Sequence, residues 1–153
     1  MPASDMETSP SIAAAVHFID VVWSGEAPTD VELLAALDRL LAAYAATPET
    51  GAADTDLEPP SLDKEALSEQ VASRFPAYGF YPAADPTASF GEAELAGDAI
   101  DDLCDMTSDM REVVWRAENI GLDDAHWFFR LLYFHWGRHA RYLALYLHAR
   151  QFG

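Results

Sequence analysis

The sequence is poor in positive charge, in cysteine and in long apolar runs. Its 153 residues hold nine lysines and arginines against 26 acids, for a formal net charge of −17. Because affinity for a phosphate backbone comes from cationic side chains, this balance excludes nonspecific nucleic-acid binding. The single cysteine, Cys104, excludes an intrachain disulfide. No run reaches the ~18 apolar residues that a membrane helix needs, so we expect neither nucleic acid nor membrane among the partners.

The chain does contain enough apolar material for a folded core. Half of its residues are hydrophobic and 12% are aromatic, which excludes wholesale disorder. The acidic start, Met1 to Glu7, lacks the basic residues and the apolar stretch of a secretory signal. Together with the lone thiol, this start predicts an acidic cytoplasmic protein. The length predicts a single domain over residues 1–153.

Apolar residues recur at helical spacing along most of the chain. Ser9, followed by proline, predicts the start of a first helix that ends near Gly25. Thr29 stands three residues before Glu32, which is the spacing of a capping box, and predicts a second helix that Pro48 stops. Further helices are predicted over 61–74, 92–118 and 123–149. No stretch alternates in the manner of a strand, so the predicted fold is an all-α bundle of about five helices.

Two segments are predicted to lie outside the helices. Residues 47–60 are polar, acidic and bounded by prolines, and we expect a mobile loop there. Residues Phe75–Tyr81 are aromatic, and the prolines in and after them forbid a long helix. This aromatic loop either plugs the open end of the helical core or forms the wall of a pocket. Packing is the commoner use of an apolar loop cluster.

An acidic row follows one side of the fourth predicted helix. At 100° per residue its members share an arc of about 100°. They are Asp98, Asp101, Asp102, Asp105, Asp109 and Glu112. Like charges one turn apart are destabilising, so water, arginines or a metal ion should offset them. The Asp-x-x-Asp spacing is similar to that of Mg-binding acids in helical nucleotide pyrophosphohydrolases, but Glu65 and Glu69 lack the spacing of a matching pair.

The fifth predicted helix carries groups that could offset this row. His135 and His139 lie four residues apart on one face, with Trp136 on the adjacent apolar side and Arg138 beside it. Gly137 costs roughly 1 kcal/mol relative to alanine in a helix interior. Its presence there suggests the close approach of another backbone or of a ligand.

The last two predicted helices should form a long antiparallel hairpin, because a short turn near Gly121 joins them. Residues whose numbers sum to about 242 then lie at similar heights. By this rule the aspartates of the fourth predicted helix lie at the same heights as His135, Arg138 and His139 of the fifth. The candidate functional or structural cluster is Asp98, Asp102, Asp105, His135, Trp136, Arg138 and His139.

Three interpretations of this cluster stay open. Asp–Arg and Asp–His pairs could fasten the two helices, or the acidic face could be solvated while the histidines bond elsewhere. In the third, Asp102, Asp105, His135 and His139 bind a divalent metal ion, as cofactor. Carboxylate and imidazole suit Zn, Mn or Fe(II), and helical bundles host such sites. However, His-x-x-x-His without the glutamate of His-Glu-x-x-His is a weak motif.

The remaining titratable groups offer no clear chemistry. His17, His126 and His148 have no obvious partner, and we expect them at the surface or at its boundary. Carboxylates around Cys104 disfavour a thiolate, so a nucleophilic cysteine is not expected.

One resemblance rests on the two most specific runs of the chain. The run Asp-Ala-Ile-Asp-Asp-Leu-Cys-Asp-Met begins at Asp98, and the run His-Trp-Gly-Arg-His begins at His135. Together they resemble a bacterial family known only as a domain of unknown function, number five thousand and sixty-three in its series. The resemblance covers most of the chain. It implies a compact helical bacterial protein and implies no activity.

Two hypotheses of function follow. The first is a non-catalytic module that acts through contacts with another protein, with Phe75–Tyr81 as its candidate surface. The second is a metal-dependent enzyme of the hydrolase type that uses an Asp/His cluster between the last two helices. An adaptor needs an exposed apolar patch. An enzyme needs a pocket in which Asp102, Asp105, His135 and His139 converge.

Overall fold

Six α-helices and one two-stranded sheet make up the part of the chain that the computed structural model describes, residues 9–92 and 94–153. The prediction of a mainly helical fold is confirmed, and the count of about five helices is one short. In chain order the elements are α2 (Pro10–Trp23), α3 (Asp30–Ala45), α4 (Lys64–Arg74), β1 (Phe80–Ala84), the short 3-10 turn η1 (Phe90–Glu92), β2 (Glu94–Asp98), α5 (Ala99–Asn119), α6 (Leu122–Leu131) and α7 (Tyr133–Phe152).

The first two helices begin where the sequence predicts. The Ser9 side chain accepts the Ile12 N–H at the start of α2. At the start of α3, Thr29 Oγ1 accepts the Glu32 N–H at 3.2 Å while the Glu32 carboxylate accepts the Thr29 N–H at 3.2 Å. This capping box satisfies two amides that would otherwise lack partners. Helix α4 is shorter than predicted, because Asp63 caps it and it begins three residues after position 61.

The sequence predicted a helix from residue 92 and no sheet, and both expectations are wrong. β1 and β2 pair antiparallel, with Tyr81 opposite Gly97. Each strand has five residues, and β1 contains Pro82, so the alternation is too short to predict a strand from the sequence. The Tyr81 ring occupies the space where a side chain at Gly97 would begin. Helix α5 therefore starts only at Ala99, after the sheet ends.

The single helix predicted over 123–149 is in fact two helices, α6 and α7, which meet at Leu132. The Trp136 indole N–H donates to the Phe129 carbonyl at 2.9 Å. A continuous helix would use that carbonyl in its own backbone ladder, and a side chain inserted into the ladder breaks it. The break therefore depends on a side-chain contact that helical periodicity does not reveal.

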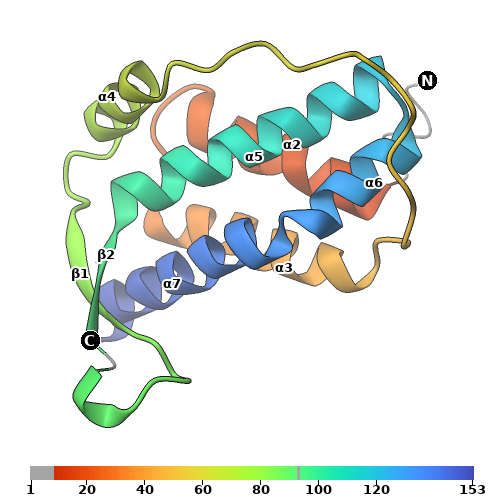
Figure 1. Ribbon diagram of the computed structural model, residues 1–153. Helices are drawn as coiled ribbons and strands as arrows, with labels where there is room; N and C mark the ends of the chain where they lie inside the picture. The colour runs from red at the N-terminus through yellow and green to blue at the C-terminus, as the bar shows by residue number, and fades with distance from the viewer. Residues whose placement is uncertain (1–8, 93) are drawn as a thin grey trace.

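The core lies between α2, α3, α5 and the α6–α7 pair, which pack against one another around it (Figure 1). Helix α5 runs along the molecule, and α6 and α7 run back beside it (Figure 1). The predicted antiparallel packing against α5 is therefore present, although two helices form it in place of one. Trp136, Phe18 and Phe129 are the largest fully buried side chains. Helix α4 packs on α5, near the end of α5 that the two strands also approach (Figure 1).

The acidic segment 47–60 forms no helix or strand and crosses the outside of the molecule (Figure 1). Two hydrogen bonds tie it to the start of α6. Thr50 donates to the Asp123 carbonyl at 2.5 Å, and the Ala53 N–H donates to Asp124 at 3.0 Å. The mobility of this loop stays a prediction.

Candidate functional site

Carboxylates of α5 face imidazoles of α7 at the levels that the antiparallel arrangement predicts. The His139 Nδ1 lies 2.6 Å from the Asp102 carboxylate. The His135 Nδ1 lies 2.6 Å from the Asp109 carboxylate. Each histidine therefore has one ring nitrogen fixed by a carboxylate on the opposite helix.

The second nitrogen of each ring points to a third carboxylate, that of Asp105. The His139 Nε2 lies 3.1 Å from Asp105 Oδ2, and the His135 Nε2 lies 3.5 Å from the same oxygen. The two rings are 4.8 Å apart and nearly perpendicular. We name the five residues Asp102, Asp105, Asp109, His135 and His139 the Asp/His cluster.

The hydrogen bond at Nδ1 determines whether Nε2 of the same ring carries a proton or a lone pair. An Nδ1–H that donates to a carboxylate leaves, in neutral imidazole, a bare lone pair on Nε2. Both lone pairs would then face the Asp105 carboxylate, which is also electron-rich. Positive charge stabilises this point, and it can come from the Lys64 ammonium beside Asp105, from protons on the rings or from a bound cation.

The electrostatics of the cluster reflect this need. Burial lowers the pKa of His139, but its hydrogen bonds to Asp102 and Asp105 outweigh burial and raise the pKa to about 9. The hydrogen bond to His139 holds the pKa of Asp105 well below its usual range, with help from Lys64, whose Nζ lies 2.8 Å from Asp105 Oδ1. Burial raises the pKa of Asp109, despite its bond to His135.

Tyr81 and Lys64 belong to the cluster's surroundings but escape prediction from sequence. The Tyr81 hydroxyl donates to Asp102, which is buried, so Asp102 is held from both sides. Both partners come from elements distant in sequence, β1 and the start of α4. The sequence predicted Asp109 only as a member of the acidic row. Its number and that of His135 sum to 244, close to 242, so the antiparallel arrangement places the two residues at similar heights.

Three residues of the predicted cluster lie apart from its centre. Asp98 caps α5 by accepting the Ile100 N–H at 3.0 Å. Trp136 is buried in the core. The Arg138 guanidinium lies over the Tyr142 ring, and none of the described carboxylates is within ion-pair distance of it.

Two further expectations need correction. The close approach at Gly137 comes from the Tyr133 ring, 2.6 Å from where a Cβ would stand, and not from another backbone or a ligand. His126 is buried rather than at the surface, and its Nε2 lies 2.8 Å from the Ser9 hydroxyl. Burial lowers the pKa of His126, which favours its neutral form.

Cys104 is buried, and burial raises the pKa of its thiol, so a nucleophilic role finds no support.

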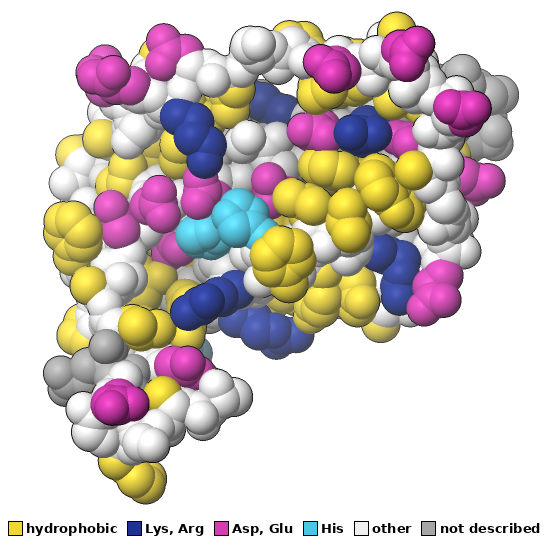
Figure 2. All heavy atoms as spheres, in the orientation of Figure 1, with side chains coloured by type: hydrophobic (Ala, Val, Ile, Leu, Met, Phe, Trp, Pro, Cys, Tyr) yellow, Lys and Arg dark blue, Asp and Glu magenta, His cyan; other side chains and the backbone are white. Residues whose placement is uncertain are grey.

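The Asp/His cluster reaches the surface. Figure 2 shows histidine side chains near the middle of one face, beside a group of acidic side chains. A pocket of about 290 Å³ opens next to them, which we name the histidine pocket. Its lining includes His135, His139 and Asp102, with Tyr81 and Arg138 at its sides. A small polar molecule could therefore reach both imidazoles from solvent.

Neither a family model nor a curated protein matches the sequence. Among solved structures, the fold is similar to that of protein BF1032 from Bacteroides fragilis, with a TM-score of 0.66. The similarity covers 97% of this chain and 99% of that one, at 14% sequence identity. At this identity the likeness shows the fold alone. In the described residues, no helix is both long and apolar enough to cross a membrane.

Proposed function

We propose that this protein binds a divalent transition-metal ion through Nε2 of His135, Nε2 of His139 and the carboxylate of Asp105, and that it uses the ion for hydrolysis. The observation that carries the proposal is the convergence of three donor atoms. Each of their side chains is also held by a hydrogen bond at its other polar atom, His139 by Asp102, His135 by Asp109 and Asp105 by Lys64. These three donors all lie within 4.8 Å of one another.

The distances within the cluster suit a metal centre. Zinc is bound by nitrogen and oxygen donors at ~2.0–2.2 Å, so neighbouring donors around it stand about 3.0–3.5 Å apart. The two separations between imidazole nitrogen and carboxylate oxygen are 3.1 and 3.5 Å, and all three donors lie within 4.8 Å of one another. Two of the three pairs therefore already stand at the spacing that a bound ion requires.

The outer contacts also suit a metal centre. A histidine that binds a metal usually donates its other ring N–H to a carboxylate or a carbonyl, which fixes the ring and makes it more basic. Asp102 does this for His139, and Asp109 does it for His135. Tyr81 in turn holds Asp102.

The ligand set indicates the metal and the chemistry. Two imidazoles and one carboxylate suit Zn, Fe(II) or Mn. Three protein ligands leave a position open for water, and zinc lowers the pKa of such water to about 7. The histidine pocket, with Arg138, Asp101 and Asp102 in its lining, would admit a polar substrate beside that water. These features support a hydrolase in preference to a storage site.

The rival hypothesis of a protein-interaction module has less support at its predicted surface. Of the aromatic side chains in this loop, Phe75 and Tyr81 are buried, Tyr78 is partly buried and Phe80 is exposed. The loop thus serves packing for the most part. The partner protein, the bacterial family resemblance and the cytoplasmic location stay predictions.

The test is metal analysis of the untagged protein with matched variants. We expect one equivalent of metal in the wild type by elemental analysis, and one-to-one binding of zinc to chelator-treated protein by calorimetry. His135→Ala and His139→Ala should lose this binding. His148→Ala is the control, because His148 lies on the same helix, is exposed and is not in the cluster.

Two results would overturn the proposal. One is zinc binding that the His135→Ala and His139→Ala variants retain, which would place the metal elsewhere. The other is the absence of one-to-one binding of zinc, manganese and ferrous iron to folded wild type. That result would leave the Asp/His cluster as a set of ion pairs that fasten α5 to α7. Circular dichroism of each variant verifies its folding.

A further inference from the structure

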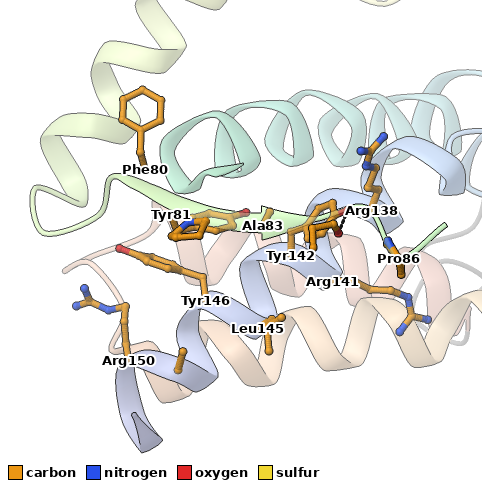
Figure 3. A pocket seen from close by; sticks show the side chains of 13 residues that line it. Phe80, Tyr81, Ala83, Pro86, Arg138, Arg141, Tyr142, Leu145, Tyr146 and Arg150 are labelled. Carbon is orange, nitrogen blue, oxygen red and sulfur yellow. Dashed lines mark hydrogen bonds between the residues drawn. The ribbon is translucent and has the colours of Figure 1, made fainter. Parts of the chain in front are cut away.

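A large apolar groove lies between β1 and α7, and of its lining the function proposed above uses only Tyr81 and Arg138. Its volume is about 1020 Å³. The side chains of Tyr81 and Tyr146 stack at 4.7 Å within its wall, and Leu145 lies beside Tyr146 on α7 (Figure 3). Two of its apolar side chains, Phe80 and Leu145, are 80% and 64% exposed. Covering such surface is favourable, since apolar area in water costs free energy.

Positive charge gathers at this groove in an otherwise acidic protein. Three of the nine lysines and arginines line it: Arg138, Arg141 and Arg150. Figure 3 shows Arg138 and Arg141 at one end and Arg150 at the other. We name this site the arginine groove.

The two ends of the arginine groove differ in charge. Arg150 is neutralised, because its guanidinium lies 2.8 Å from the Asp30 carboxylate. Within residues 9–92 and 94–153, no described carboxylate lies within 4.0 Å of Arg138 or Arg141. Among the described residues, Arg141 donates to the Tyr133 hydroxyl, at 2.9 Å. Hydrogen bonds from Thr87, and to a smaller extent the charge of Arg138, lower the pKa of the Asp85 carboxylate at this end. The groove therefore has two arginines without an ion pair to any described carboxylate at one end and is apolar along the rest of its length.

We propose that the arginine groove binds an organic anion with one carboxylate head and an unbranched apolar chain. The carboxylate would lie at the end of the groove that carries Arg138 and Arg141, where a guanidinium can donate two parallel hydrogen bonds to it. The chain would follow Leu145 and Tyr146 toward Ala149. From Arg141 to Ala149 the helix rises about 12 Å, which sets the length of the chain.

The one-ended charge favours this ligand over an acidic helical peptide. A peptide would carry acids along its length and would need cations along the whole groove, whereas Arg150 already has its carboxylate. A second copy of this chain is also disfavoured, because each copy carries a net charge of −17. Two such copies repel each other at long range.

The experiment is calorimetric titration of the full chain with decanoate, kept below the concentration at which it forms micelles. A chelator is present throughout, so the outcome does not depend on a metal in the Asp/His cluster. We expect one-to-one binding of decanoate. Acetate has the head without the chain, so it buries little apolar area and should bind at least about tenfold more weakly. Decyltrimethylammonium has the chain with the opposite charge, so it loses the charge-assisted hydrogen bond and should also bind at least about tenfold more weakly.

Variants locate the site. The double variant Arg138→Gln/Arg141→Gln should weaken decanoate binding by about tenfold or more. Leu145→Asp should abolish binding, and because Leu145 is largely exposed the variant should fold. Arg39→Gln is the matched control, because Arg39 is exposed on α3 and does not line the groove. It should bind decanoate as the wild type does.

Several results would overturn the inference. Equal affinity for decanoate and decyltrimethylammonium would show apolar adsorption without recognition of charge. Unchanged binding in the double arginine variant would place the ligand elsewhere. Sedimentation of the wild type as a dimer and of Leu145→Asp as a monomer would identify the occupant as a second copy. Binding of an acidic amphipathic peptide without binding of decanoate would identify a protein partner instead.

Discussion

Replacing His139 by glutamine should destabilise the metal-free protein near pH 6 and much less near pH 10. The hydrogen bonds of His139 to Asp102 and Asp105 raise its pKa from the ordinary 6.5 to about 9, against the opposing effect of burial. The folded pKa lies above the unfolded one, so the folded state binds the proton more tightly. The stabilisation is complete below about pH 6.5 and is lost as pH rises through about 9.

The size of the effect follows from the same two values. Each pH unit between the folded and unfolded pKa is worth 1.36 kcal/mol, so a rise from 6.5 to about 9 corresponds to about 3 kcal/mol. The His139 side chain is 19% exposed, so solvent screens the pairing only in part. The free energy of unfolding of the wild type, relative to the variant, should therefore fall by about 3 kcal/mol between about pH 6 and pH 10.

Urea unfolding in the presence of chelator measures this difference. His139→Gln is compared with wild type at each pH, which cancels the titration of groups common to both. His148→Gln is the control, because His148 lies on the same helix, is exposed and is not part of the Asp/His cluster. The NMR shift of the His139 ring provides an independent readout, with an expected midpoint at about pH 9.

The reasoning is refuted if, with chelator present, His139→Gln lowers the free energy of unfolding by the same amount at about pH 6 and at about pH 10. Added zinc should reverse the sign of the dependence, because metal binding needs neutral imidazole and is lost on acidification. The two states of the cluster, protonated and metal-bound, are therefore distinguished by the direction in which stability changes with pH.

Three further changes test the fold around the site. Gly137→Ala should destabilise the protein by about 1–3 kcal/mol in thermal or urea unfolding, because the new Cβ overlaps the Tyr133 ring; a gain in stability would contradict this packing. Asp124→Asn should cost about 1–3 kcal/mol in urea unfolding, because Asp124 is buried and pairs with Arg116 at 2.8 Å. Limited digestion with proteinase K should cut first within 47–60, and a first cut within α5 would show that its boundaries are wrong.

Features set by neighbouring residues in the chain were predictable from the sequence. The capping box of Thr29 and Glu32 and the cap at Ser9 each involve residues three apart, so their spacing carries the signal. The pairing of Asp102 with His139 was also accessible. It follows from helical rise and a short turn, and these fix the height of a residue on an antiparallel helix.

Features set by contacts between distant segments were not predictable. The break at Leu132 depends on an indole that reaches the Phe129 carbonyl, and the sheet depends on two five-residue strands that stabilise each other only when paired. Lys64 reaches Asp105 from another helix. Helical arithmetic gives height but not rotation, so it could not show that both Nε2 atoms turn toward one carboxylate.

Tyr81 connects the two proposed sites and allows them to be tested separately. Its ring lines the arginine groove, and its hydroxyl donates to Asp102, which orients His139. Tyr81→Phe removes the hydroxyl and keeps the ring. Loss of an outer-shell partner commonly costs about 10–100-fold in metal affinity, so zinc binding should weaken by about tenfold or more in calorimetry. Decanoate binding should not change, and a loss of decanoate binding with intact zinc binding would contradict both assignments of this side chain.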